Sequence, residues 1–437
     1  MVASRLFLFI FAAALCGCGI YDALTNEPAD QRGDVGVSDA HFDDDADGSD
    51  ADGSDADAPG PDNCDECAHS CIEDECVNIE SIFAGGQHTC AIVEDGRMAC
   101  WGQNSQGQLG IDDSARPFPT FIDAVQGVQD ASAGWEHTCA IDGSNIAWCW
   151  GRNEEGQLGA GSTANTRHDP QAVAVAGDVH LIAAGYSHGC AVHGEGNISC
   201  WGAEVDGQLG NGQSGPSVGI APQVIEVFDG SSTVSGLSAG WGSSGAISGG
   251  IVKMWGRNDW DQLGQDESSD YESDPVEVDV LDTDGPLAQS FSAGWRHACA
   301  VRDGGEVWCW GDDEGGQLGR GDEPQLPGPV VDLPVDGSTA VDAGWGSHSC
   351  ARSSHWLYCW GNNDSGQLGT DEPSQSAFAV QVFDEPVMDL AVGQSHTCAL
   401  VTGGELYCWG NNSNGQLGVG PTPNQSSEPL RVATPPS

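Results

Sequence analysis

The chain has 437 residues, of which 63 are Gly and 15 are Trp, and 39% of the residues are hydrophobic. This composition favours many short strands joined by tight turns over long helices, so we expect an all-β fold. The net charge is −53, and with only 13 Lys and Arg the chain lacks the cations needed to bind nucleic acid or an anionic lipid surface.

The first 17 residues are predicted to form a secretory signal peptide. Arg5 gives a positively charged start, and residues 6–15 form an apolar run too short to span a bilayer. Leu-Cys-Gly-Cys at 15–18 resembles a bacterial lipobox, which implies cleavage before Cys18 and lipidation of that cysteine. The alternative is an ordinary cleaved signal followed by an incidental cysteine. Because no later segment is apolar enough for a membrane helix, we expect the lipid to be the only membrane contact.

The residue after the lipobox bears on the location of the chain. Gly at position 19, where Asp would retain a lipoprotein in the inner membrane, resembles the pattern of lipoproteins sorted to the outer membrane of Gram-negative cells. We therefore expect a chain that is exported and lipid-anchored in the bacterial envelope, in the outer membrane.

Residues 18–62 are predicted to be a disordered acidic spacer after the lipidated cysteine. Asp alternates with Ala, Gly and Ser, as in DDDADGSDADGSDADA at 43–58, and such a stretch buries too little apolar surface to offset its chain entropy. Closely spaced carboxylates also occur in calcium-binding loops, but the bidentate Glu of an EF-hand is missing. We expect no cofactor, with weak Ca²⁺ binding by the spacer as the open alternative.

Residues 63–77 form a small cysteine-rich segment. Cys64, Cys67, Cys71 and Cys76 could hold a zinc ion with four thiolates. In an oxidising compartment we expect two disulfides instead, and the spacing of the cysteines leaves the connectivity of these disulfides open.

One sequence pattern recurs seven times after residue 84. Its copies lie at 84–110, 133–159, 184–210, 239–264, 293–319, 343–369 and 392–418. Each copy contains alternating apolar residues, a turn with Gly, a second short run ending in Trp-Gly, and usually Gly-Gln-Leu-Gly, which together predict a β-hairpin followed by a turn. A period near 50 residues indicates a propeller or a solenoid.

Ala-Gly-x-x-His followed by Trp-Gly-x-Asn-x-x-Gly-Gln-Leu-Gly resembles the repeat of the regulator of chromosome condensation family. The resemblance covers residues 79–432 and implies a seven-bladed β-propeller, here within residues 78–437, in an exported bacterial member of the family. Residues 79–83 precede the first repeat and residues 429–432 follow the last. We expect these two segments to complete one shared blade.

Six repeats carry two cysteines each, and we expect each pair to form a disulfide across its hairpin. The pairs are Cys90 and Cys100, Cys139 and Cys149, Cys190 and Cys200, Cys299 and Cys309, Cys350 and Cys359, and Cys398 and Cys408. The fourth repeat has Gly245 and Met254 instead. Loss of both positions together is expected of bonded partners.

Histidines recur once per repeat at His88, His137, His188, His297, His348 and His396. Because a catalytic group is seldom needed six times, we interpret them as structural hydrogen-bonding residues within each blade, and we predict no metal site. The fourth repeat has Ser243 at this position. An inserted residue before His348 leaves its role open.

The residue after Ala-Gly is aromatic in five consecutive repeats. These residues are Trp135, Tyr186, Trp241, Trp295 and Trp345. On one face of a ring they would form an aromatic crescent able to bind a sugar or a partner protein. The competing interpretation is stacking between blades. The longest connections, 211–235 and 264–290, are the other places where we expect specificity.

No motif for catalysis stands out, so we assign no catalytic residue and expect no enzyme activity. The preferred function is a monomeric, envelope-anchored, non-catalytic scaffold that binds a protein or glycan partner. The alternative is a carbohydrate-active or lyase-type propeller enzyme. Guanine-nucleotide exchange, which the family resemblance implies for eukaryotic members, fits an exported acidic chain least well.

Overall fold

The computed structural model describes residues 70–433 apart from 74, 113, 165–166, 217, 229–232, 266–268, 282–286, 322–327, 331–332, 334–336, 372–373 and 384. The predicted signal peptide, Cys18, the acidic spacer, Cys64 and Cys67 lie outside these residues. Within the described ranges, no helix is long and apolar enough to cross a bilayer.

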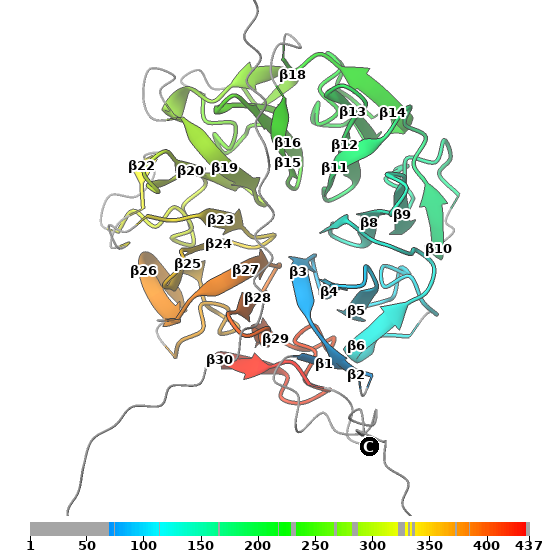
Figure 1. The fold of residues 1–437 in the computed structure, drawn as a ribbon. Coiled ribbons are helices and arrows are strands. Elements are labelled where there is room, and N and C mark those ends of the chain that lie inside the picture. The colour runs from blue at the N-terminus through cyan, green and yellow to red at the C-terminus, as the bar shows by residue number, and fades with distance from the viewer. Residues whose placement is uncertain are drawn as a thin grey trace, which may run out of the picture. The chain divides into compact units, whose positions relative to one another are not determined.

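Seven four-stranded antiparallel sheets form a ring, which confirms the predicted all-β, seven-bladed propeller (Figure 1). Blades 1 to 7 follow chain order, and strands a to d run outward from the centre. Strands a are β3 (Ile79–Ala84), β7 (Asp130–Ala133), β11 (Val179–Ala184), β15 (Val234–Ala239), β19 (Ala288–Ala293), β23 (Ala340–Ala343) and β27 (Val387–Val392). Strands b are β4 (His88–Val93), β8 (His137–Ile141), β12 (His188–His193), β16 (Ser243–Ser248), β20 (His297–Arg302), β24 (His348–Arg352) and β28 (His396–Val401).

The two outer strands complete each blade. Strands c are β5 (Met98–Gly102), β9 (Ala147–Gly151), β13 (Asn197–Ala203), β17 (Ile251–Arg257), β21 (Val307–Gly311), β25 (Leu357–Asn362) and β29 (Leu406–Asn411). Strands d are β6 (Arg116–Ile122), β10 (Arg167–Ala172), β14 (Val218–Ile225), β18 (Tyr271–Glu277), β22 (Gly328–Pro329), β26 (Gln375–Phe383) and β30 (Gln425–Arg431). A short 3₁₀ helix, Asp279–Leu281, follows β18.

The expected shared blade is wrong. β3 pairs with β4 in blade 1, and β30 pairs with β29 in blade 7, so each blade is built from four consecutive strands. The segment at 429–432 ends a blade, since Leu430 lies opposite Cys408 and the Val432 N–H donates to the Leu406 carbonyl at 2.8 Å. The ring therefore closes by contacts between blades 7 and 1 and not by exchange of a strand.

A short hairpin, β1 (Ser70–Ile72) and β2 (Glu75–Val77), precedes the ring. Cys71 lies opposite Cys76, and both are disulfide-bonded, so these two thiols are not zinc ligands. The hairpin contacts the turns between strands b and c: Ser70 Oγ donates to the Gly404 carbonyl at 2.8 Å, and Arg97 pairs with Glu75 at 2.8 Å. The chain thus enters the propeller at the end of the ring that carries the b–c turns.

The six expected cysteine pairs are bonded across strands b and c. In each pair the two Cα atoms are 4.1 Å apart, and the two residues are direct partners in the strand register. In blade 4, Gly245 and Met254 face each other at the same position. Closing a loop of about 10 residues contributes roughly 2.5–3 kcal/mol in the chain-entropy account.

The most regular contact between blades is made by the tryptophan of Trp-Gly. Each indole is buried, and its Nε1–H donates to the carbonyl of the Gln in the preceding blade's Gly-Gln-Leu-Gly turn, or its Asp-Gln-Leu-Gly equivalent in blade 4, at 2.8–3.0 Å. The pairs are Trp101 with Gln416, Trp150 with Gln108, Trp201 with Gln157, Trp255 with Gln208, Trp310 with Gln262, Trp360 with Gln317, and Trp409 with Gln367. The first of these joins the last blade to the first.

Local geometry explains the rest of the repeat. Gly102, after Trp101, has φ +103°, and a Cβ there would lie 2.6 Å from the Gln87 carbonyl oxygen, so only Gly fits. The Asn104 side chain accepts a hydrogen bond from the Leu109 N–H at 2.9 Å and shapes the turn that presents the Gln carbonyl. Among the described residues the apolar core is likewise divided into seven clusters, and the one that holds Ile79 and Trp101 also holds Leu400.

Candidate functional site

The recurring histidines connect neighbouring blades, so the predicted bonding within each blade is wrong. Each Nε2 lies 2.7–3.0 Å from a Thr or Ser hydroxyl of the next blade at five junctions. The pairs are His88 with Thr138, His188 with Ser244, His297 with Ser349, His348 with Thr397, and His396 with Thr89. The insertion before His348 therefore does not remove it from this role.

Two junctions lack the bond, for different reasons. The residue of blade 3 at the position equivalent to Thr138 is Gly189, which has no hydroxyl, and the buried His137 Nε2 has no hydrogen-bond partner within the described part of the chain. At the junction between blades 4 and 5 both positions differ from the pattern. Ser243 replaces the histidine of blade 4, and Ala298 replaces the Thr or Ser of blade 5. Burial lowers the pKa of His88, His137, His297 and His348 to about 3 and of His188 and His396 to about 4. Neutral histidines sealed between blades have a structural role.

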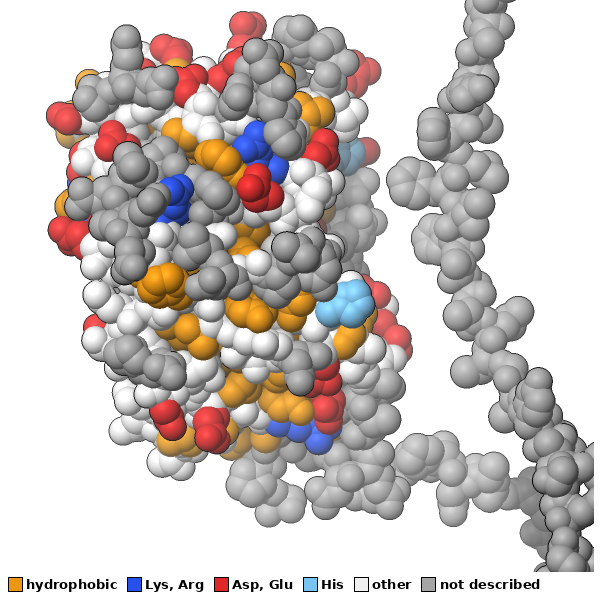
Figure 2. All heavy atoms as spheres, turned by 90° about the vertical axis from the view of Figure 1, so that its left-hand side faces the viewer, with side chains coloured by type: hydrophobic (Ala, Val, Ile, Leu, Met, Phe, Trp, Pro, Cys, Tyr) orange, Lys and Arg blue, Asp and Glu red, His pale blue; other side chains and the backbone are white. Residues whose placement is uncertain are grey.

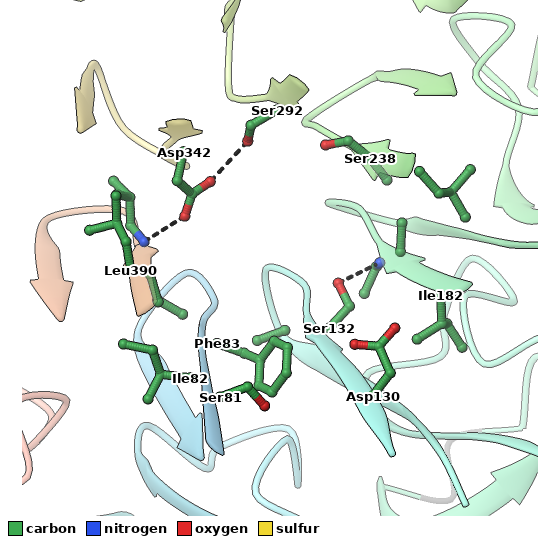
Figure 3. Close-up of a pocket in the computed structure, with 18 of the residues that line it drawn as sticks. Ser81, Ile82, Phe83, Asp130, Ser132, Ile182, Ser238, Ser292, Asp342 and Leu390 are labelled. Carbon is green, nitrogen blue, oxygen red and sulfur yellow. Dashed lines mark hydrogen bonds between the residues drawn. The ribbon is translucent and has the colours of Figure 1, made fainter. Parts of the chain in front are cut away.

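The a strands surround a central cavity of about 480 Å³. Figure 3 shows Asp342 accepting a hydrogen bond from Ser292 and pointing toward the backbone of the next blade, where the Val392 N–H donates to it at 2.8 Å. Ser132 accepts from the Ala184 N–H in the same way at 3.0 Å. Polar side chains of the cavity are thus engaged in holding adjacent a strands together.

The cavity is acidic. Burial raises the pKa of Asp130 and of Asp342 to about 6, and burial also raises the pKa of Asp389, which accepts a hydrogen bond from the Ile82 N–H at 2.9 Å. No Lys, Arg or His is among the described residues that line it. Among all the described residues of the chain, no group of His, Cys, Asp and Glu is suited to hold a metal ion. We assign no chemistry to this cavity.

The five predicted aromatic residues meet at one mouth of the cavity. The aromatic cluster is Trp135, Tyr186, Trp241, Trp295 and Trp345. Ring centroids are 5.2 Å apart for Trp135 and Tyr186, 6.3 Å for Tyr186 and Trp241, and 5.9 Å for Trp241 and Trp295. Trp135 of blade 2 also lies 6.3 Å from Trp345 of blade 6, across the ring. The rings stack between blades, which is the structural interpretation given above. They also gather on one face of the ring, as the binding interpretation requires.

The cluster forms a wall of a second pocket, of about 370 Å³, which we call the aromatic pocket. Its other wall is polar and comes from blades 6 and 7, and the residues there are Gly346, Ser347, Asn362, Gln394 and Ser395. Trp345, only 8% exposed, lines both this pocket and the central cavity, so it separates the two. The connections 211–235 and 264–290 contribute no described residue to this lining.

Arginines that the sequence analysis did not single out lie against the cluster. Arg257 is 4.1 Å from the Trp241 ring centroid, and Arg296 is 4.0 Å from that of Trp295 and 4.4 Å from that of Trp260. Carboxylates pair with them, Asp259 with Arg257 at 2.5 Å and Asp312 with Arg296 at 3.9 Å. Their positions in the repeat could have indicated this. Arg257 lies two residues after the Trp of its Trp-Gly pair, and Arg296 directly follows the aromatic residue of its repeat.

The cluster also differs from the blade tryptophans in its hydrogen bonding. The four cluster indoles donate no hydrogen bond to any described residue, whereas all seven blade indoles do. The hydroxyls of Ser347 and Ser395 likewise make no hydrogen bond within the described ranges. Gln394 accepts from Gln87 through its oxygen at 3.1 Å, which leaves its amide N–H groups without a described partner. The pocket therefore carries available donors and acceptors.

The aromatic pocket lies at the end of the ring formed by the a–b turns. Each b strand runs from an a–b turn to a b–c turn, so the two kinds of turn lie at opposite ends. The β1–β2 hairpin contacts the b–c turns through Gly404 and Arg97. The β1–β2 hairpin therefore contacts the end of the ring opposite to the aromatic cluster.

Two sequence profiles, both described as regulator of chromosome condensation (RCC1) repeat, match the chain. One matches residues 79–108, 128–157, 179–208, 288–317 and 389–416, and the other matches 95–141, 145–192, 355–400 and 403–437. Together they cover more than half of the chain. Blade 4, which lacks the cysteine pair and the histidine, is matched by neither profile.

Curated relatives share part of the chain. The ultraviolet-B receptor UVR8 of Arabidopsis thaliana is 31% identical over 270 residues, which is 60% of this chain and 60% of the receptor. The E3 ubiquitin-protein ligase HERC2 of Homo sapiens is 31% identical over 140 residues, 32% of this chain and 3% of the ligase. The chain therefore spans less than two thirds of the length of either relative.

Solved structures share the fold. Yeast RCC1 (Prp20), solved with Kap60, has a TM-score of 0.67 and 20% identity, over 82% of this chain and 84% of its own. Human WBSCR16 has a TM-score of 0.66 and 20% identity, over 75% of this chain and 87% of its own. At this level of identity the likeness concerns the propeller alone.

The buried histidines predict a specific effect of acid. The folded pKa of His137 and His297 is about 3, so between pH 6.5 and about 3 the unfolded chain binds protons that the folded chain does not, and stability falls as pH falls. Each such histidine contributes up to about 1.4 kcal/mol per pH unit in that window. Asp130 and Asp342, raised from 3.8 to about 6, oppose this in part between those values.

We therefore expect His137→Gln, which removes the histidine that lacks an Nε2 partner, to make the thermal midpoint fall less between pH 7 and pH 5 than in the unchanged protein. The control is His355→Gln at an exposed position outside the junctions, which should leave the pH dependence unchanged. Equal pH dependence in all three proteins would contradict the assignment.

Proposed function

Because the chain belongs to the regulator of chromosome condensation repeat family, we propose that it is a non-catalytic binding scaffold that holds a protein or glycan partner on its aromatic face. The observation that carries the proposal is the aromatic cluster with its unpaired indole donors on one end of the ring. Tryptophan and tyrosine contribute much of the binding energy at interfaces, because each buries a large apolar ring and still offers a polar group.

The relatives support a role in binding. Yeast RCC1, which shares the fold, was solved in complex with another protein, Kap60. The strongly acidic composition makes nucleic acid an unfavourable partner. Figure 2 agrees with this, since one side of the propeller carries many acidic and few basic side chains.

We also propose that the chain is exported and anchored by lipid at Cys18 in the outer membrane. The signal-like segment and the lipobox resemblance support this proposal. The six disulfides of the propeller are in keeping with an oxidising compartment. Entry of the chain at the b–c turns would leave the aromatic face accessible to a partner.

Affinity capture from envelope extract tests the scaffold proposal. We expect the unchanged protein to retain a partner that is lost when Trp135, Trp241 and Trp295 are replaced by Ser. The control replaces Trp148 and Trp308 by Ser, since these partly buried tryptophans bond Asp142 and Glu306 at the other end of the ring. Equal retention by both variants would contradict an aromatic docking face, and turnover of a glycan would favour the enzyme alternative.

Metabolic labelling with a radioactive fatty acid tests the anchor. The unchanged chain is expected to take up label and to fractionate with the outer membrane, whereas Cys18→Ala should take up none. The control is Cys16→Ala, which keeps the predicted lipidated residue and should still be labelled. Label in the Cys18→Ala chain would contradict the assignment.

A second candidate function, a response to ultraviolet-B light, is favoured by one observation. Trp135 and Trp345 lie within 6.3 Å of each other, as do Trp241 and Trp295, and closely packed indoles absorb ultraviolet-B light. The relative UVR8 is an ultraviolet-B receptor. Brief ultraviolet-B irradiation should change the near-ultraviolet circular dichroism of the unchanged protein and not that of Trp241→Phe/Trp295→Phe. No difference between the two proteins would exclude this candidate.

A further inference from the structure

The aromatic pocket combines two unlike walls. One wall consists of the ring faces and edges of the cluster, and the other offers the hydroxyls of Ser347 and Ser395 and the amide of Gln394. The cluster adds unpaired indole N–H groups to the apolar wall. A suitable ligand must therefore present an apolar face to one side and hydrogen-bonding groups to the other.

The charges around the pocket favour a neutral ligand. None of the described residues that line it is charged. Arg257 and Arg296 already occupy ring faces of Trp241 and Trp295 at 4.1 and 4.0 Å, so a second cation in the pocket would be repelled by them. An anion would approach through the field of a chain with a net charge of −53.

The size of the pocket fits a small ligand or the end of a larger one. Its volume of about 370 Å³ lies at the small end of the range of roughly 300–1,000 Å³ that is usual for small-molecule sites. Trp345 closes the pocket toward the central cavity, so a long chain cannot pass through it. A ligand of matching size is therefore a terminal unit or a short oligomer.

We propose that the aromatic pocket binds a neutral hexopyranose unit at the end of an oligosaccharide. One face of such a ring carries only C–H groups and stacks on indoles, while the hydroxyls on its edge exchange hydrogen bonds with Gln394, Ser347 and the cluster N–H groups. This inference rests on the proposed binding function and narrows its partner from protein or glycan to a neutral glycan. A peptide partner is the other outcome of the test.

Isothermal titration of the full chain with maltose, cellobiose and lactose tests the inference. At least one of these disaccharides should bind, and its affinity should fall at least about tenfold in Trp135→Ala, on the apolar wall, and in Gln394→Ala, on the polar wall. The thermal midpoint of each variant is measured alongside, so that loss of binding is counted only for a variant that retains the fold. Trp308→Ala, at the other end of blade 5, should bind as the unchanged chain does.

Two results would overturn the inference. One is that no disaccharide binds in a way that depends on Trp135 or Gln394. The other is that tetramethylammonium binds there and competes, which would identify a cation site. If either occurs while capture of a partner still depends on the cluster, the glycan inference fails and the scaffold function stands. If capture is also independent of the cluster, both fail.

Discussion

The structure depends on one hydrogen bond repeated seven times. In each blade the indole N–H of the Trp-Gly pair donates to the Gln carbonyl of the preceding blade, and the bond from Trp101 to Gln416 joins the ends of the ring. A buried indole N–H without an acceptor would cost about 1–3 kcal/mol, so each blade needs its neighbour's turn in place. Thr and Ser hydroxyls donate to the same carbonyls at five of the junctions, which makes those five Gln carbonyls shared acceptors.

This arrangement divides the residues of each repeat into those that hold the ring together and those that can vary without loss of the fold. Trp, Gly, Gln, Leu and the histidine are engaged inside and between blades, whereas the residue after Ala-Gly faces the mouth of the ring. That position holds Gly86 and Gln394 in blades 1 and 7 and aromatic residues in the five blades between them. Because the aromatic rings satisfy no need of the fold comparable to that of the blade tryptophans, we assign them to binding.

Much of this could be predicted from the sequence, because repetition amplifies weak signals. The spacing of Trp-Gly indicated seven units, and the joint change to Gly245 and Met254 identified the disulfides. The wrong predictions concern contacts between different repeats, because the pattern within one repeat does not show which residues of the next blade it contacts. The partner of His88 is Thr138, which lies 50 residues away in the sequence. The sequence of residues 429–432 likewise did not show that β30 pairs with β29 in blade 7. The polar wall and the arginines were missed because Gln394, Ser347 and Arg296 meet the cluster only in space.

Hydrogen exchange of the indole N–H groups, followed by NMR on protein labelled with ¹⁵N-tryptophan, tests the central claim most directly. We expect the seven blade indoles to exchange slowly and together, at the rate of opening of the whole ring, and the indoles of Trp135, Trp241 and Trp295 to exchange rapidly. Rapid or uneven exchange among the blade indoles, or protection of the cluster indoles equal to theirs, would contradict it.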